Sequence, residues 1–207
     1  MEDIRNYIEL CGEITGEPEF SHTGRNEDYY VFPMSVSRLS GNVDTVNVLV
    51  RDRIFKEINI ERGSRMGVIG EVRSFNNKSG TGNRLIITVF AKTVFPSSGE
   101  DKNAVEITGV VCKKPNLRWT PMGREICDIM LAVNRRYGRS DYLPCIAWGQ
   151  EAANMSYLDV GAEIKISGRL QSRKYIKVEN DVSVEKTAFE ISINESSPVI
   201  EDYGQEM

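Results

Sequence analysis

Residues Met130 to Gln150 read Met-Leu-Ala-Val-Asn-Arg-Arg-Tyr-Gly-Arg-Ser-Asp-Tyr-Leu-Pro-Cys-Ile-Ala-Trp-Gly-Gln. Two apolar runs flank a basic turn that contains a tyrosine and a glycine. In the second run, Tyr142 and Trp148 are six residues apart. Because side chains of a strand alternate between its faces, this even spacing predicts both rings on one face. The other face then carries small or apolar residues suited to a core: Leu143, Cys145 and Ala147.

A strand with rings outside and a core inside predicts a binding platform. Arg135, Arg136 and Arg139 lie beside it in the sequence. Aromatic rings next to cations are typical of surfaces that bind single-stranded nucleic acid, since every base has a π-face and every linkage a phosphate. In the alternative interpretation, the rings are core residues and the arginines form an ordinary solvated face.

The totals indicate a soluble globular protein of one large or two ordinary domains. The chain has 207 residues, of which 40% are hydrophobic and 27% charged. No apolar run approaches the roughly 20 residues that span a bilayer, and the acidic start, Met1–Arg5, is unlike a secretory signal. We therefore expect a cytoplasmic protein. The four cysteines form no C-x-x-C pair, which favours buried reduced thiols over a zinc site.

The net charge of −4 is unevenly distributed along the chain. Residues 1–99 carry −1, residues 100–194 carry +1, and residues 195–207 hold four acids and no base. The negative charge is therefore concentrated in the C-terminal tail, and the second half of the chain is locally basic.

The chain contains a diverged duplication. Residues 7–14 resemble residues 104–111 at an offset of 97. Further equivalent pairs lie at offsets of 97 or 98: Pro18 and Pro115, Val36 and Val133, Arg38 and Arg135, Asp44 and Asp141, Gly63 and Gly161, Gly70 and Gly168, Ser74 and Ser172. We predict a first domain over 1–95, a polar linker over 96–102, a second domain over 103–195 and an acidic tail over 196–207.

Each repeat predicts five strands with one short helix between the third and the fourth, which is the element order of an OB-fold barrel. The expected fold is therefore all-β, with two tandem OB-fold barrels. In the second repeat the strands are predicted at 105–111, 125–135, 142–148, 163–171 and 185–193, with the helix at 150–159 and a polar hairpin at 172–184. In the first repeat they are predicted at 7–14, 28–38, 45–50, 65–73 and 84–91, with the helix near 52–60. Pro144 predicts an irregularity in its strand, because proline cannot donate to a ladder.

Residues 103–194 resemble the bacterial single-stranded DNA-binding proteins. The matching stretches are Val105–Gly109, Pro115–Arg118 with Gly123, Leu131–Arg135, Ile146–Gly149, Tyr157–Gly161 and Gly168–Tyr175. Taken together and in this order, these stretches are specific for that family. The resemblance implies a non-catalytic protein that needs no cofactor and protects single-stranded DNA in replication, recombination or repair.

The resemblance also implies which residues bind DNA. The positions that match the stacking rings of the family are Tyr137, Tyr142, Trp148 and Tyr175. Trp119, in the first long loop, is a further candidate for stacking. The basic side chains that would neutralise phosphates are Arg135, Arg136, Arg139, Arg169, Arg173 and Lys174.

The first repeat departs from this pattern. The counterparts of the four rings are roughly Ser40, Thr45, Arg51 and Asn77, although Phe75 could serve in the hairpin. We expect the first domain to act mainly in assembly and to bind DNA weakly or not at all. Alanine at Arg38 or Arg73 should then leave affinity nearly unchanged.

The tail departs too, because it is short and ends Gln205-Glu-Met207 without the Pro-Phe that recruits replication proteins in the family. Recruitment of those partners is therefore doubtful, and the tail could act as a decoy for the basic groove. Since the family commonly assembles four OB domains, two per chain imply a homodimer by analogy.

Other chemistries receive little support. The stretch Lys78–Asn83 lacks the spacing of a phosphate-binding loop, and the one histidine, His22, leaves no catalytic triad or histidine metal site. Two other functions stay open: a primosome-type OB protein that binds mainly other proteins, and an RNA-binding OB module. A phage or plasmid protein would share these features.

Overall fold

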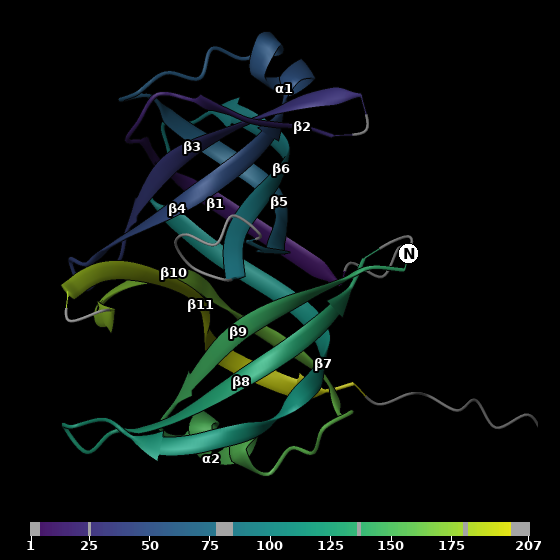
Figure 1. The fold of residues 1–207 in the computed structure, drawn as a ribbon, viewed down its shortest axis with the longest axis vertical. Coiled ribbons are helices and arrows are strands. Elements are labelled where there is room, and N and C mark those ends of the chain that lie inside the picture. Colours follow the sequence, from purple (N-terminus) through teal and green to yellow (C-terminus); the bar gives the residue numbers. More distant parts are fainter. Residues whose placement is uncertain (1–4, 25, 78–84, 136–137, 180–181, 200–207) are drawn as a thin grey trace, which may run out of the picture.

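The computed structural model describes residues 5–24, 26–77, 85–135, 138–179 and 182–199. Strands dominate it, and they form one continuous eleven-stranded sheet that curls into two barrels, one above the other in Figure 1. No helix in these ranges is long and apolar enough to cross a membrane.

The first barrel is formed by five strands that close in the order β1-β5-β6-β4-β3-β1. Antiparallel pairing of β1 with β3 and parallel pairing of β4 with β6 complete the ring. Its elements are β1 (Asn6–Ile14), β2 (Glu19–Gly24), β3 (Glu27–Ser37), β4 (Val43–Arg51), α1 (Asp52–Glu57), β5 (Arg65–Asn76) and β6 (Leu85–Pro96). The exposed strand β2, which was not predicted, pairs with β3 at the edge of the sheet.

The second barrel repeats this plan, with closure in the order β7-β8-β9-β11-β10-β7. Its elements are β7 (Lys102–Trp119), β8 (Glu125–Asn134), β9 (Ser140–Trp148), α2 (Gln150–Ser156), β10 (Glu163–Glu179) and β11 (Val182–Pro198). The tandem OB arrangement is therefore confirmed. Strands β10 and β11 are longer than predicted, because the arms of the expected polar hairpin at 172–184 continue the ladder between them. Strand β7 is longer because its residues up to Trp119 pair with β8.

The two barrels meet through antiparallel pairing of β1 with β7. Ile8 lies opposite Val105, its own equivalent in the other repeat. Equivalent positions that face each other in this way define an approximate two-fold axis, the geometry of an isologous dimer interface within one chain. The predicted linker is a packed turn, since Arg65 donates hydrogen bonds to the Gly99 carbonyl and the Asp101 carboxylate, each at 2.7 Å.

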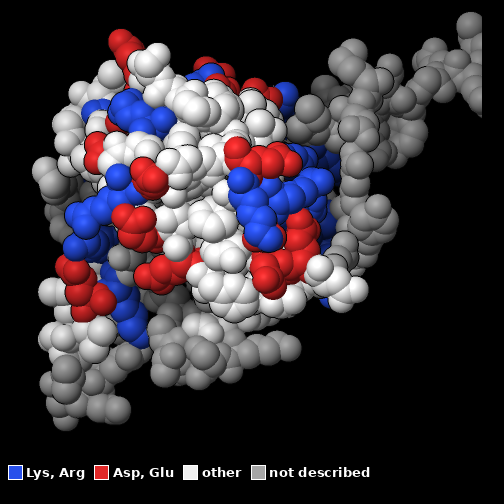
Figure 2. Space-filling model, turned by 90° about the horizontal axis from the view of Figure 1, so that it is seen from above, with Lys and Arg blue, Asp and Glu red and all other residues white. Residues whose placement is uncertain are grey.

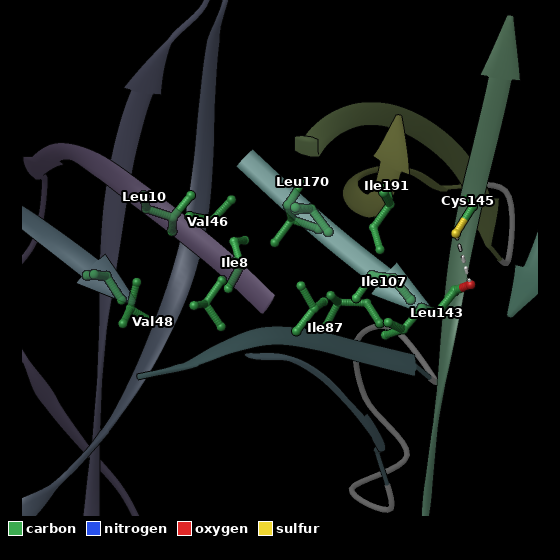
Figure 3. Close-up of a cluster of buried hydrophobic side chains, with 14 of the residues drawn as sticks. Ile8, Leu10, Val46, Val48, Ile87, Ile107, Leu143, Cys145, Leu170 and Ile191 are labelled. Atoms are coloured by element: carbon green, nitrogen blue, oxygen red, sulfur yellow. Dashed lines mark hydrogen bonds between the residues drawn. The ribbon is translucent and has the colours of Figure 1, made fainter. Parts of the chain in front are cut away.

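The apolar core runs through both barrels and across the β1–β7 junction (Figure 3). The predicted inner face of β9 is confirmed, because Leu143, Cys145 and Ala147 are all buried. All four cysteines are free, as predicted, and three of them are buried.

The repeated glycines Gly70 and Gly168 lie where two strands approach too closely for any side chain. A Cβ on Gly70 would lie 2.2 Å from the Phe90 carbonyl oxygen, and one on Gly168 would lie 2.1 Å from that of Ser192. Both positions also mark the register shift of their ladders. The same bulge therefore shapes both barrels.

The irregularity expected at Pro144 is not found in the ladder between β8 and β9. Met130 pairs with Pro144 there without a register shift. Proline is tolerated where its missing N–H is not needed for the ladder.

Candidate nucleic-acid interface

The outer face of β9 carries the predicted rings. Tyr142 is 51% exposed and Trp148 is 39% exposed. Six residues of strand separate them, which corresponds to about 20 Å. An extended surface of this length suits several nucleotides in single file, and we call it the β9 platform.

The β9 platform continues onto β8 and β7. Across the ladders, Trp148 lies opposite Ile126, and Ile126 lies opposite Arg118. Directly opposed residues share a face, so Arg118 belongs to the same surface. Its guanidinium is held by Asp128 in a two-contact ion pair of 2.5 and 2.9 Å, and this pairing lowers the pKa of the Asp128 carboxyl.

Tyr175 lies beside the platform. It lines a small cavity of about 270 Å³ together with Pro144 of the β9 platform and Phe189. The Arg173 guanidinium lies 5.7 Å from the centre of the Tyr175 ring. The structure therefore brings Tyr175 together with the outer face of β9.

The two cations of this hairpin are exposed. The side chain of Arg173 is 55% exposed and lies 3.8 Å from Glu190, and that of Lys174 is 72% exposed and pairs with Glu185 at 3.0 Å. The Lys174 pair is exposed on both sides and therefore weak. The Arg173 pair is long, and its cation is exposed although Glu190 is not. Both cations can therefore exchange their carboxylate for a phosphate.

Arg135 has a different environment from the one predicted. Its Nε donates to the buried carboxylate of Asp141 at 2.7 Å, and its Nη2 donates to the carbonyl of Ser74 in the first barrel at 2.9 Å. The Asp141 carboxylate also accepts from the Ser74 backbone N–H at 2.5 Å. Arg135 is therefore engaged in joining the two barrels.

The equivalent residues of the first barrel make the same contact in the opposite direction, as expected from the approximate two-fold axis. Arg38 donates to buried Asp44 at 2.7 Å, and this bond raises the pKa of the guanidinium. Asp44 accepts from the Ser172 N–H at 2.9 Å, and Ser172 Oγ accepts from the Thr45 N–H at 3.1 Å. We call the two Arg–Asp–Ser sets the interbarrel clamp: Arg38, Asp44 and Ser172, with Arg135, Asp141 and Ser74.

Arg73 also belongs to this junction. It pairs with Glu71 and lies 3.3 Å from Asp141. Arg38 and Arg73 are therefore engaged in ion pairs, and alanine at either position probes stability as well as affinity.

Arg169 is a half-buried cation with a hydrogen-bond donor that is not used within the described residues. Its Nε has no hydrogen-bond partner among the described residues, and its Nη2 lies 3.4 Å from the Gln171 side chain. Burial lowers the pKa of the guanidinium. A buried donor without a partner is costly, which favours an anionic ligand or water at this point.

The remaining predicted residues are dispersed. Trp119 is 60% exposed but follows Arg118, so strand alternation directs it to the other face of its hairpin. Arg139 is exposed and lines a groove toward the first barrel. Arg136 and Tyr137 lie outside the described residues.

This groove, which the sequence analysis missed, has a volume of about 1270 Å³. It includes Arg51, Arg73 and Phe90 from the first barrel with Arg135 and Arg139 from the second. Its aromatic residues do not align with the rings of the family, so a comparison of repeats could not reveal it. The sequence signal that was available is the pair of aromatics at 29 and 90 in two predicted strands.

Basic and acidic side chains are intermixed on the rest of the surface that Figure 2 shows. On the face in Figure 2, Lys and Arg side chains lie in separate clusters, most of them beside acidic side chains. Within the described ranges no group of three or more His, Cys, Asp or Glu residues could hold a metal ion.

The fold and the site define a tandem OB-fold protein with a surface of exposed rings and arginines. The comparisons agree. Residues 102–199 match the model of the single-strand binding protein family. The chain is 35% identical over 80 residues to the single-stranded DNA-binding protein B of Bacillus subtilis, covering 35% of this chain and 71% of that protein. The chain therefore belongs to the single-strand binding protein family.

Two further comparisons define the extent of this likeness. The single-stranded DNA-binding protein of Bacillus cereus is 36% identical over 80 residues, 35% of this chain and 47% of that protein. The chain thus spans about half the length of several curated relatives that it matches. The crystal structure of the single-stranded DNA-binding protein from Thermus aquaticus superposes with a TM-score of 0.79, at 21% identity, over 98% of this chain and 96% of that one. This superposition confirms the fold of both barrels.

Proposed function

We propose that the protein binds single-stranded DNA with little sequence preference and protects it during replication, recombination or repair. The observation that carries this proposal is the exposure of Tyr142 and Trp148 on one face of β9, within the part of the chain that matches the family. Exposed rings at strand spacing bind bases by stacking, at roughly 1–3 kcal/mol per base. Relatives that are named single-stranded DNA-binding proteins support the same ligand.

The ligand follows the β9 platform in this proposal. Bases stack on Tyr142, Trp148 and Tyr175, and phosphates contact Arg173 and Lys174, whose own side chains are exposed. Tyr137 and Arg136 stay in the proposed site on the strength of the resemblance, with Arg139, Arg169 and Trp119 as peripheral contacts. Arg135 supports the site from the interbarrel clamp.

The division of labour between the domains is part of the proposal. The second domain supplies the principal platform, and the first acts mainly in assembly through the clamp and the β1–β7 pairing. Two chains form a homodimer with four OB domains, by analogy with the family. The protein works in the bacterial cytoplasm without a cofactor or a catalytic step.

A titration tests the function directly. Both tryptophans, Trp119 and Trp148, lie in the second barrel, and a Trp119→Phe variant leaves Trp148 as the sole reporter on the platform. We expect a long dT oligomer to quench this fluorescence and the affinity to fall with salt, with a slope of about 0.7 per phosphate contact in log–log form. Absence of quenching and of binding overturns the proposal and favours the protein-interaction module.

A competition experiment distinguishes binding of DNA from binding of RNA. Unlabelled dT and rU oligomers of equal length compete for the quenched complex, and we expect dT to displace more effectively. Stronger displacement by rU would assign the protein to RNA. Sedimentation equilibrium measures the chain count: twice 23.4 kDa supports the homodimer, and a single chain overturns it.

A further inference from the structure

We infer that Ser74 of the first barrel is a positioning residue for the β9 platform, because its hydroxyl fixes the Tyr142 end of the platform from across the interbarrel junction. This inference rests on the proposed function and deepens it, since it adds a residue that controls DNA binding without contacting DNA. The side chain of Ser74 is buried, with 8% of the residue exposed. Its effect on affinity must therefore act through the residues of the second barrel that it contacts.

The hydroxyl of Ser74 holds the backbone of Tyr142. The Tyr142 N–H donates to Ser74 Oγ at 2.8 Å. A shielded N–H without an acceptor costs free energy, so a buried acceptor on a β-strand restrains its donor to one position. The ring of Tyr142, which is exposed on the outer face of β9, therefore extends from a backbone that the first barrel fixes.

This end of β9 is paired with a neighbouring strand on one side. Tyr142 lies opposite Ala132 of β8 on that side. On the other side, the parallel ladder with β11 begins at Cys145, three residues further along. The Tyr142 N–H points to this second side, where its acceptor belongs to β5. Among the described residues, the first barrel thus supplies the hydrogen bond that a neighbouring strand of the second barrel would otherwise provide.

The other two polar groups of Ser74 bind the turn that leads into β9. Its N–H donates to the buried carboxylate of Asp141 at 2.5 Å, and its carbonyl accepts from the Arg135 guanidinium at 2.9 Å. Arg135 and Asp141 flank the segment 136–140, and the Arg135 N–H donates to the Arg139 carbonyl at 2.6 Å. Ser74 is therefore bonded to both ends of the turn as well as to the first ring of the platform.

The internal repeat provides an equivalent hydroxyl that has no ring to position. Ser172 Oγ accepts from the Thr45 N–H at 3.1 Å, and Thr45 is the counterpart of Tyr142 in the first repeat. The Ser172 N–H donates separately to the Asp44 carboxylate at 2.9 Å. Both hydroxyls thus accept a backbone N–H from the other barrel, but that of Ser74 alone of the two holds an aromatic residue.

The test compares Ser74→Ala with Ser172→Ala as its matched control. Each variant loses one hydroxyl acceptor between the barrels and keeps the backbone hydrogen bonds of that residue. Anisotropy of a labelled dT oligomer of about 30 nucleotides, long enough for two OB folds, measures affinity. Thermal unfolding followed by circular dichroism confirms that both variants are folded. We expect Ser74→Ala to weaken binding by about 3–10-fold, the usual contribution of one hydrogen bond, and Ser172→Ala to bind within about 2-fold of the wild type.

A double-mutant cycle shows whether Ser74 acts through Tyr142. In a Tyr142→Ala background there is no ring left to position, so adding Ser74→Ala should change affinity by less than about 2-fold. In a Trp148→Ala background, at the other end of the platform, the same change should cause its full loss. A general loosening of the interbarrel junction would instead cause the same loss in both backgrounds.

Salt dependence gives a further readout. Ser74 is uncharged and buried, so its substitution should remove no phosphate contact. The slope of log affinity against log salt should therefore change by less than the roughly 0.7 that one phosphate contact contributes. A larger decrease would mean that the substitution displaces a cation from the DNA, and it would contradict a role in positioning Tyr142.

Two further outcomes overturn the inference and leave the proposed function intact. In one, Ser74→Ala binds dT as tightly as the wild type, or Ser172→Ala loses as much affinity as Ser74→Ala. In the other, the losses from Ser74→Ala and Tyr142→Ala are additive. In each case the wild type still binds dT. If the wild type itself does not bind dT, the proposed function fails, and the inference fails with it.

Discussion

Asp44 in the first barrel accepts a hydrogen bond of 2.9 Å from the backbone N–H of Ser172 in the second. The equivalent bond from Ser74 to Asp141 runs in the opposite direction between the barrels, at 2.5 Å. Both carboxylates are buried and each is paired with an arginine of its own barrel. Two buried charges that depend on the partner barrel for a donor fix the orientation of one barrel on the other.

Asp141→Ala should lower the free energy of unfolding by about 3–5 kcal/mol, the usual cost of removing one partner from a buried ion pair. The change leaves Arg135 without its carboxylate and the Ser74 N–H without its acceptor. Urea unfolding followed by tryptophan fluorescence measures it. Asp128→Ala, which removes a partly exposed pair with Arg118, is the control and should cost about 0–1 kcal/mol. Equal losses in the two variants would contradict a special role for the clamp.

Tyr142→Ala and Trp148→Ala should each weaken binding to dT by about 5–150-fold, which corresponds to roughly 1–3 kcal/mol per stacked base. The fluorescence of Trp119 or the anisotropy of a labelled oligomer measures this loss. Tyr157→Ala is the matched control, because Tyr157 is 87% exposed beside α2 and lies off the platform. If the platform variants bound dT as tightly as the Tyr157 variant, the bases would have to bind elsewhere on the protein.

Gly70→Ala and Gly168→Ala should each destabilise the protein by about 1–3 kcal/mol, the range for overpacking. The new Cβ atoms would lie 2.2 and 2.1 Å from carbonyl oxygens, so the strands must move apart. Thermal unfolding measures the loss. Gly99→Ala serves as the control, because the nearest atom to its Cβ would be 3.5 Å away, and it should change stability by less than about 0.5 kcal/mol. A neutral Gly70→Ala would mean that the bulge adapts at little cost.

Cys127 and Cys145 should be the slowest thiols to react with a disulfide reagent in the folded protein. Burial raises the pKa of both thiols, so the thiolate fraction at pH 8 is far below that of an exposed cysteine. Alkylation followed by mass spectrometry locates the modified sites. After unfolding in guanidinium chloride, all four cysteines should react quickly. Rapid modification of Cys145 in the native state would indicate opening of the second barrel.

Much of the fold could be predicted from the amino-acid sequence. The offset of 97 or 98 between repeats predicted two barrels, and alternation in β9 placed Tyr142 and Trp148 outside with Leu143 inside. Both signals are local or periodic. A side chain's face in a strand depends only on its position along that strand, so it can be obtained without knowing the partner strands.

The contacts of the repeated Arg and Asp residues could not be predicted and became visible in the folded structure. Arg135 looked like a phosphate contact because it adjoins a basic turn, yet its guanidinium is bound to Asp141 and to Ser74 in the other barrel. Likewise, His22 of β2 stacks on Tyr29 of β3, and Tyr29 lies 6.3 Å from Phe90 of β6. Pairing between strands far apart in sequence, and the burial of charge at the β1–β7 junction, depend on the closure of both barrels, which no local pattern encodes.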